Sequence, residues 1–194
     1  MENTDFPRGL QVWGPLLRAR IYGIETNPSV AIYHGHMVET EHKAVASKFG
    51  NYTVVLEEAT GGLSTIVGAV IGLFDHNFDP VAYIGAAETG DDTMAGYALV
   101  ADHPEQEFVV QEDGDAGVCG LADAGQNADM VATSAGSTAT GLSGWEMDSS
   151  TVAVTATLAL QLLNPAPGND ATVVHCDWIV KINSHYTGNN IAGV

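Results

Sequence analysis

The sequence predicts an all-β protein, a barrel or sandwich of antiparallel strands preceded by an extended N-terminal arm. Three observations favour this fold class. Runs of strand length alternate with Gly, Asn, Asp and Pro, as in short strands joined by turns. Two longer segments near the C-terminus alternate between apolar and other residues, which is the period of a half-buried strand. No window gives a convincing amphipathic helix, apart from a weak one at residues 41–49.

The predicted arm comprises residues 1–28, and the β-rich domain comprises residues 29–194. Glycine and proline recur in the arm without a sustained apolar period, which indicates an extended segment. Its apolar side chains are too many to stay in water, so we expect them to pack on the chain's own body or on a neighbouring subunit. Large apolar side chains supply most contact area at interfaces, and the expected partner-binding residues are Phe6, Leu10, Trp13, Leu17 and Tyr22.

Several segments of the domain are expected to form strands. The short ones are residues 30–33, 52–57, 63–74, 96–101 and 108–111. Residues 151–163 carry apolar side chains at alternate positions and predict one long strand. Residues 172–183 have the same period, and the turn residues at 164–170 predict an antiparallel hairpin between the two. The uncharged, Ser/Thr/Gly-rich residues 133–144 are expected to form a loop.

The charge is distributed unevenly along the chain. The formal net charge is −18, yet the first 48 residues are neutral, with five bases and five acids, and Lys181 is the one base that follows. A surface so poor in cations does not neutralise phosphates or attract an anionic membrane. We therefore expect neither nucleic acid nor a membrane as a partner. Solubility, a salty medium or a basic partner surface would each account for the acidity.

Cysteine usage and the first residues bear on the compartment. Cys119 and Cys176 are too few for a disulfide framework in 194 residues, so we expect reduced thiols. The start of the chain lacks a secretory-signal profile, and the longest apolar stretch, residues 66–74, is about half the length that spans a bilayer. We expect the protein in the cytoplasm unless it leaves inside a particle.

The strongest candidate metal ligands are His34 and His36, followed by Glu41, because residues i and i+2 of a strand share one face. Cupins use such a His-x-His motif, so a cupin-like metal-dependent enzyme is the alternative function. The glycines that flank the motif are misplaced here, and no second cupin motif follows. Residues 111–115 look like a calcium loop but lack EF-hand spacing, and a solvated acidic turn is expected. We expect no enzymatic activity, no metal and no cofactor.

Six segments, in this order, resemble one known family: residues 3–10 (NTDFPRGL), 31–35 (AIYHG), 108–113 (FVVQED), 125–129 (GQNAD), 136–144 (GSTATGLSG) and 178–185 (WIVKINSH). The series is similar to the small capsid cement, or head-decoration, proteins of tailed bacteriophages. The likeness spans nearly the whole chain. That family usually reads Gly-Asp-Pro where this chain has Gly35, His36 and Met37, which places the histidines outside the family pattern.

The resemblance implies a non-enzymatic β domain that binds the outer surface of a capsid in many copies and stabilises the lattice of the major capsid protein. It also implies a location in the virion, after synthesis in the host cytoplasm. We expect a homo-oligomer, with a trimer favoured over a dimer, whose arms reach the capsid, because linked weak contacts bind with avidity. A virion carbohydrate-binding or fibre protein would need an exposed loop aromatic, for which Trp145 is the candidate, although a core position is expected.

Overall fold

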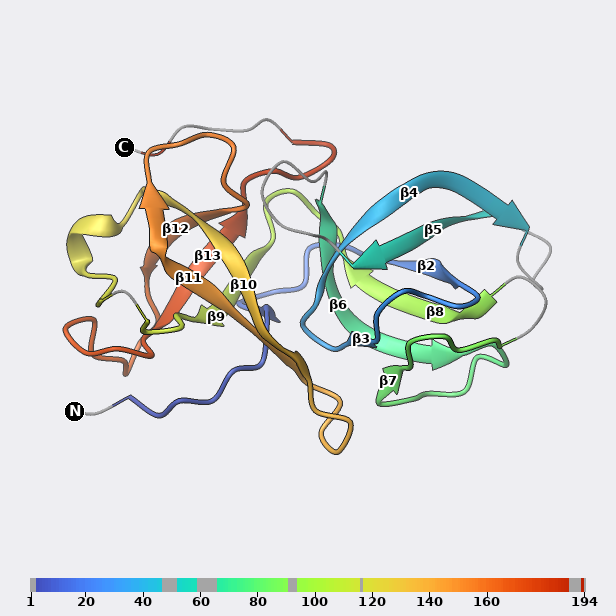
Figure 1. The fold of residues 1–194 in the computed structure, drawn as a ribbon. Coiled ribbons are helices and arrows are strands. Elements are labelled where there is room, and N and C mark those ends of the chain that lie inside the picture. The colour runs from blue at the N-terminus through green and yellow to red at the C-terminus, as the bar shows by residue number, and fades with distance from the viewer. Residues whose placement is uncertain are drawn as a thin grey trace.

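The computed structural model describes residues 3–46, 52–58, 66–90, 94–115, 117–188 and 193, and within them the protein is all-β, as predicted. The strands form two lobes that lie side by side (Figure 1). One lobe is a closed barrel, and the other is an open, curled sheet. The described residues contain no α-helix, and their one helical element is the 3-10 turn η1 (Leu121–Asp123).

The barrel lobe has five strands in the order β2–β5–β4–β6–β8, and β8 closes it by pairing with β2. The strands are β2 (Ala19–Glu25), β4 (Met37–Ala46), β5 (Tyr52–Glu58), β6 (Ile66–Asp75) and β8 (Met94–Ala101). Neighbours are antiparallel except β2 and β5, which are parallel. A short antiparallel ribbon of β3 (Ile32–Tyr33) and β7 (Tyr83–Ile84) packs Ile32 and Ile84 into the barrel core.

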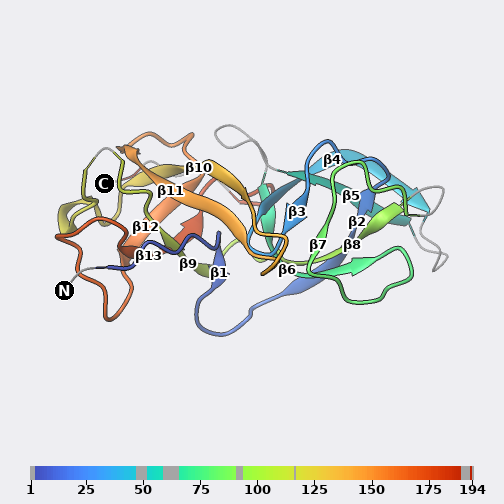
Figure 2. The ribbon, with the colours of Figure 1, turned by 60° about the horizontal axis from the view of Figure 1, so that its bottom comes forward.

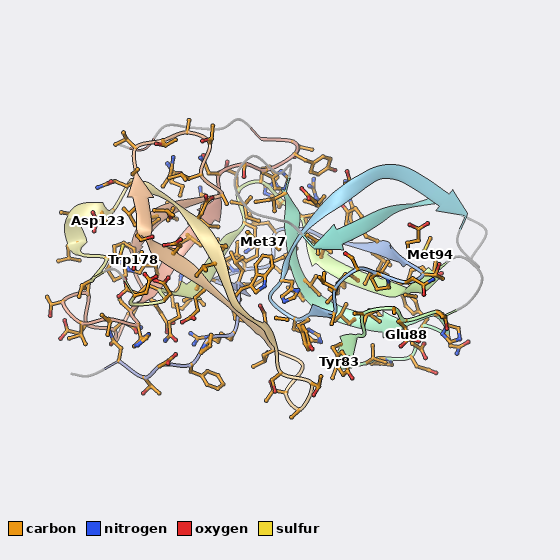
Figure 3. The ribbon with its side chains drawn as sticks, in the orientation of Figure 1. Met37, Tyr83, Glu88, Met94, Asp123 and Trp178 are labelled. Atoms are coloured by element: carbon orange, nitrogen blue, oxygen red, sulfur yellow. The ribbon has the colours of Figure 1, made fainter. Side chains whose placement is uncertain are left out.

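The sheet lobe has six antiparallel strands in the order β1–β9–β13–β12–β10–β11. The strands are β1 (Gln11–Val12), β9 (Glu107–Gln111), β10 (Asn127–Gly136), β11 (Ser143–Ala153), β12 (Leu160–Pro165) and β13 (Asp177–Ile182). Asn3 and Gly193, the first and last described residues, both bond to this lobe, Asn3 to Asp170 O and Gly193 N to Val154 O. Trp178, the largest fully buried side chain, lies in its core (Figure 3).

The two lobes share part of their cores. Met37, at the start of β4, is fully buried and packs in the core of the sheet lobe, and Figure 3 shows it between the lobes. Ile66 and Ala101, from β6 and β8, join the same cluster. Burial of apolar area across the junction stabilises the pair of lobes as one body, at about 25 cal/mol per Å².

The N-terminal segment, residues 3–18, is extended and passes along the sheet lobe to the junction (Figures 1 and 2). Its backbone bonds to both lobes, from Leu10 N to Gly35 O at 2.9 Å and from Trp13 N to Glu107 O at 2.9 Å. Gly9 has a φ of +66°, and a Cβ on it would lie 2.3 Å from Gly35 O. This approach therefore requires glycine.

Residues 19–25 correct the predicted arm, because they form β2 of the barrel. Tyr22 and Ile24 pack in the barrel core, so the boundary at residue 28 lies beyond a strand of the body. The extended part of residues 1–28 described by the structure before that strand is residues 3–18.

The five short predicted runs all contain strands, namely β3, β5, β6, β8 and β9. The hairpin near the C-terminus is also confirmed, with β12 and β13 paired antiparallel. The weak helix was wrong over its described part, because β4 continues to Ala46, and residues 47–49 lie outside the described residues. The predicted loop at 133–144 is shorter than expected, since β10 and β11 extend into it from either side.

The single long strand predicted at residues 151–163 was wrong. β11 ends at Ala153 and β12 begins at Leu160, and these two strands pair with opposite edges of β10. The chain must therefore cross over between them. The Asn183 side chain donates to the carbonyls of Ala156 and Leu158 at 2.9 and 3.0 Å, which satisfies backbone groups that strand pairing would otherwise use.

Among the described residues, no helix has the length and apolar character needed to cross a bilayer.

Candidate functional site

Exposed apolar side chains gather at the end of the N-terminal segment and the start of β2. Leu16, Leu17 and Ile21 are 49%, 49% and 47% exposed. Ile21 lies opposite Leu99 of β8, which is half-buried, and directly opposed residues share one face of a sheet. We call Leu16, Leu17, Ile21 and Leu99 the arm surface.

The structure divides the five predicted partner-binding residues into two groups. Phe6 and Leu17 are exposed, and Trp13 is half-buried. Leu10 is fully buried in the core of the sheet lobe, and Tyr22 is buried in the barrel. Leu10 and Tyr22 therefore attach the segment to its own chain, whereas Phe6 and Leu17 leave apolar area open to a partner.

Gln106 holds the chain that leads into the arm surface. Its side chain is buried, its Oε1 accepts from Leu17 N at 2.9 Å, and its Nε2 lies within 3.4 Å of the Trp13 and Pro15 carbonyls. A shallow groove of about 180 Å³ lies here, lined by Trp13, Pro15, Leu17, Glu105, Gln106 and Glu107. The exposed leucines are thus presented on a fixed backbone, which lowers the entropy that a partner must remove on binding.

Asp102, which follows β8, holds the start of β2 in place through its buried carboxylate. Its carboxylate is fully buried and accepts from Arg18 Nε at 2.7 Å and from the Tyr22 hydroxyl at 2.6 Å. Burial, with the bond to Asp102, raises the pKa of Tyr22 and keeps it a donor. Arg20 Nε lies 3.6 Å from the same carboxylate, with its side chain 55% exposed.

Tyr186 adds an exposed aromatic side chain beside this region. It is 41% exposed and lies near Arg18 and Tyr22. Tyr and Arg are enriched at interface centres. The arm surface and its surroundings therefore have the composition of a protein-binding surface.

The described cations are largely neutralised within the chain. Arg8 pairs with Asp177 at 2.8 Å, Lys181 pairs with Glu105 at 2.7 Å, and Arg18 and Arg20 face Asp102. The side chains of the remaining two bases, Lys43 and Lys48, lie outside the described part. Paired cations contribute little attraction for phosphate, so the expectation of no nucleic-acid partner remains a prediction that this arrangement supports.

The histidine pair does not have the geometry assumed for a cupin-like site. Gly35, between the two histidines, has a φ of +88°, so the chain turns and the pair is not on one strand face. His36 is fully buried, its Nε2 lies 2.6 Å from Ala135 O, and its ring stacks on Trp145 at 4.8 Å. Burial lowers the pKa of His36 to about 4. The side chain of Glu41 lies outside the described part.

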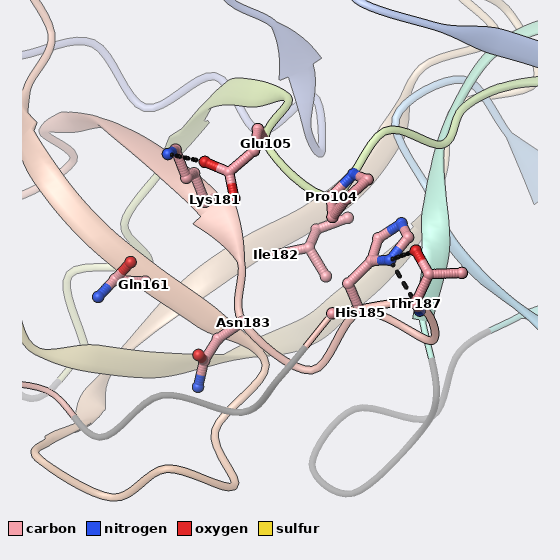
Figure 4. Close-up of a pocket in the computed structure, with 9 residues that line it drawn as sticks. Pro104, Glu105, Gln161, Lys181, Ile182, Asn183, His185 and Thr187 are labelled. Atoms are coloured by element: carbon pink, nitrogen blue, oxygen red, sulfur yellow. Dashed lines mark hydrogen bonds and ion pairs between the residues drawn. The ribbon is translucent and has the colours of Figure 1, made fainter.

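A cleft of about 340 Å³ in the sheet lobe also contains a histidine (Figure 4). His185 Nε2 lies 3.2 Å from Asp102 O, and its Nδ1 accepts from Thr187 N at 3.1 Å. Burial lowers the pKa of His185. With both ring nitrogens engaged, His185 positions the chain and is not placed to exchange protons with a molecule in the cleft.

The cysteines and Trp145 are core residues. Cys119 and Cys176 are buried free thiols, and burial raises the pKa of both, that of Cys176 to about 12. A thiol of such pKa is a poor nucleophile at neutral pH. Trp145 is 4% exposed, as expected for a core residue, so it is not an exposed loop aromatic.

The acidic turn brings Asp113, Asp115 and Asp148 within ligand distance of one another. Asp113 accepts from the Ser149 hydroxyl at 2.9 Å, and Asp148 accepts from the Ser150 hydroxyl at 2.6 Å. These bonds suit a solvated acidic turn, and exposed carboxylates gather without a cation in many proteins.

Comparisons with models of protein families, with curated proteins and with solved structures found no match for this chain.

Leu16 and Ile21 belong to the apolar side chains of the predicted arm but were not among the five residues selected for partner binding, and Asp102 was missed. In β2 the buried Tyr22 and Ile24 alternate with the outward Ile21, and that period-2 signal was present within the stretch interpreted as an arm. Asp102 gave no signal, because its role depends on Arg18 and Tyr22, which are about 80 residues away.

Proposed function

We propose that the chain is a non-enzymatic capsid cement protein, which binds the outer surface of a tailed-phage capsid and stabilises the lattice of the major capsid protein. It is made in the host cytoplasm and carried on the virion. The arm surface is the observation that carries this proposal, since it presents apolar side chains with Arg20 and Tyr186 beside them on an otherwise acidic protein.

The charge supports an outward-facing body. Nineteen of the 24 acids follow residue 48, and packaged DNA repels such density. Three of the four arm-surface residues, Leu16, Leu17 and Ile21, belong to the neutral first 48 residues, and the fourth, Leu99, is uncharged. Contact with a shell through this surface therefore carries no such penalty. The acidic remainder then faces solvent.

We further propose a homo-oligomer, with a trimer favoured over a dimer. One copy of the arm surface is small for a stable interface, which usually buries about 800 Å² on each partner. Several copies held in one oligomer bind together at an effective concentration on the order of mM. Mass measurement of the protein at neutral pH tests this point, and a monomer would contradict it.

The decisive experiment compares capsid binding of wild type with the double variant Leu17→Ser/Ile21→Ser. Both side chains are about half exposed, so the variant should fold within about 0.5 kcal/mol of wild type per site. We expect sedimentation with capsid shells, made from the major capsid protein of the same phage genome, to show at least a tenfold weaker Kd for the variant.

Leu121→Ser is the matched control, because Leu121 is 71% exposed but lies on η1, away from the arm surface. It should bind shells as wild type does. Equal binding by the double variant, or wild type that does not bind shells at all, would overturn the proposal. Deleting residues 1–22 is a poorer test, since it removes the core residues Leu10 and Tyr22.

A further inference from the structure

Three possible metal ligands from distant parts of the sequence meet on the sheet lobe. Asp5 comes from the N-terminal segment, Glu146 from β11, and His175 from the loop that precedes β13. One ligand atom from each of the three lies within 4.8 Å of the other two. The set combines one imidazole nitrogen with two carboxylates, so it is not an acidic cluster alone.

His175 supplies the first independent sign of a ligand. Its Nδ1 is shielded from solvent, and among the described residues no group is placed to hydrogen-bond to it. A buried polar atom without a partner is costly. The ring is held close to the turn at Gly114, where an added Cβ would lie 3.2 Å from His175 Cε1. The nitrogen is thus held in place without a hydrogen-bond partner among the described residues.

Glu146 supplies the second sign. The residue is 6% exposed, and it lies on β11 between the buried Trp145 and Met147. A carboxylate removed from water in this way is stabilised by a proton, by hydrogen bonds or by a nearby cation. One of its ligand oxygens lies within 4.8 Å of the ligand atoms of Asp5 and His175, so a cation held by those two residues would also be close to this buried carboxylate.

Asp5 is held in place from both sides. Gln111 Nε2 donates to Thr4 O at 2.8 Å, and its Oε1 accepts from Phe6 N at 2.7 Å. Asn3 Nδ2 lies within 3.2 Å of the carbonyl of Val174, next to His175. The same Gln111 Nε2 also lies 3.1 Å from His175 O. One side chain therefore positions two of the three ligands.

We propose that Asp5, Glu146 and His175 bind a divalent transition-metal ion, Zn²⁺ by preference. Zinc accepts nitrogen and carboxylate ligands at about 2.0–2.2 Å, and three protein ligands leave a fourth position for water. Tetrahedral ligands at that distance are about 3.3–3.6 Å apart, so the exposed Asp5 side chain closes the remaining gap. The ion would join the N-terminal segment to β11 and to the loop before β13, independently of any capsid contact.

The full chain is first treated with a chelator to remove bound metal. Zinc binding is then measured by calorimetric titration, and the effect of zinc on Tm by thermal unfolding. We expect one Zn²⁺ per chain and a rise in Tm with zinc. His175→Asn should weaken zinc binding at least tenfold and remove the rise in Tm. Asparagine tolerates the left-handed backbone at this position, where φ is +60°, so the variant should melt as wild type does without zinc.

His76→Ala is the matched control, because it removes an imidazole from the loop after β6 in the barrel lobe, and it should leave zinc binding unchanged. Wild type that binds no zinc would overturn the proposal, as would a His175→Asn variant that binds zinc like wild type. Loss of binding in His34→Ala with retention in His175→Asn would also overturn it. Glu146→Gln gives a second independent variant, with the same expected loss of zinc binding.

Discussion

The two lobes satisfy their buried backbone groups in different ways. Among the strands of the barrel lobe, the described buried side chains are apolar, and buried polar side chains begin only at flanking positions such as His36 and Asp102. In the sheet lobe, buried polar side chains are common, and they include Gln111, Glu112, Asn127, Glu146 and Asn183. A closed barrel has no edge strand with unpaired backbone N–H and C=O groups, whereas an open sheet has such edges.

The polar side chains of the sheet lobe attach loops and the N-terminal segment. Glu112 is fully buried and accepts from the backbone nitrogens of Cys119 and Cys176, at 2.8 and 3.5 Å. Gln111 holds the N-terminal segment with both ends of its amide, since its Nε2 donates to Thr4 O and its Oε1 accepts from Phe6 N. The barrel therefore depends on strand pairing, while the sheet lobe also depends on single polar side chains where loops and the N-terminal segment join it.

The largest expected effect comes from removing the buried carboxylate of Asp102, which joins the end of β8 to the start of β2. Asp102→Ala leaves Arg18 and Tyr22 without their buried partner, and losing one partner of a buried pair costs about 3–5 kcal/mol. Urea unfolding should show that loss. Asp79→Ala, at an exposed turn, is the control and should change stability by less than about 0.5 kcal/mol. A loss below about 1 kcal/mol in Asp102→Ala would refute this role.

A pH dependence follows from His36, which contacts both lobes. Its pKa is about 4 when folded and 6.5 ordinarily, so the folded state binds fewer protons between these values. Stability should therefore fall as the pH is lowered from 6.5 to 4, by roughly 3 kcal/mol from this residue. Urea unfolding at several pH values measures it. His36→Gln should flatten that part of the profile, and an unchanged slope would contradict the assignment.

The close approach of the N-terminal segment to Gly35 can be tested by adding a side chain at Gly9. Gly9→Ala places a Cβ against Gly35 O in a left-handed backbone conformation, which should cost about 1–3 kcal/mol. Gly14→Ala is the matched control, because Gly14 also has a positive φ but no heavy atom within 4 Å of an added Cβ. If both variants lose equal stability, backbone conformation alone explains the effect and the close approach does not.

The smallest effect is expected at the ion pair between Lys181 and Glu105. The Glu105 side chain is 66% exposed, and exposed pairs contribute about 0.2–1 kcal/mol. Lys181→Met should therefore lower stability by less than about 1 kcal/mol, with the difference disappearing in high salt. A larger loss would show that surface charge, as well as buried polar groups, maintains the sheet lobe.

The local sequence pattern was sufficient to predict a strand where the buried side chains lie on one face of that strand. Trp178, Val180 and Ile182 alternate and are buried, and the turn residues before them identified the hairpin. β4 was missed because Glu39, Glu41 and Lys43 make it polar. Its strand form depends on pairing with β5 and β6, which no local window contains.

The candidate surface was predictable only in part. Apolar character selected Phe6, Leu10 and Leu17 alike. Leu10 is nevertheless buried, because its backbone nitrogen bonds to Gly35 O and its side chain packs in the core of the sheet lobe. Those partners are distant in sequence, so exposure could not be assigned residue by residue. The proposed ligands Glu146 and His175 could not be found from the sequence for the same reason, since each lies more than 100 residues from Asp5.

The path of the N-terminal segment also sets the order in which the molecule can be completed during synthesis. The ribosome delivers Asn3 long before its partner, because its side chain bonds to the carbonyl of Asp170, 167 residues later. Leu10 likewise waits for core neighbours such as Trp178. Contacts of such long sequence separation slow folding, so the N-terminal segment lacks part of its core contacts until β13, the last described strand, has been made.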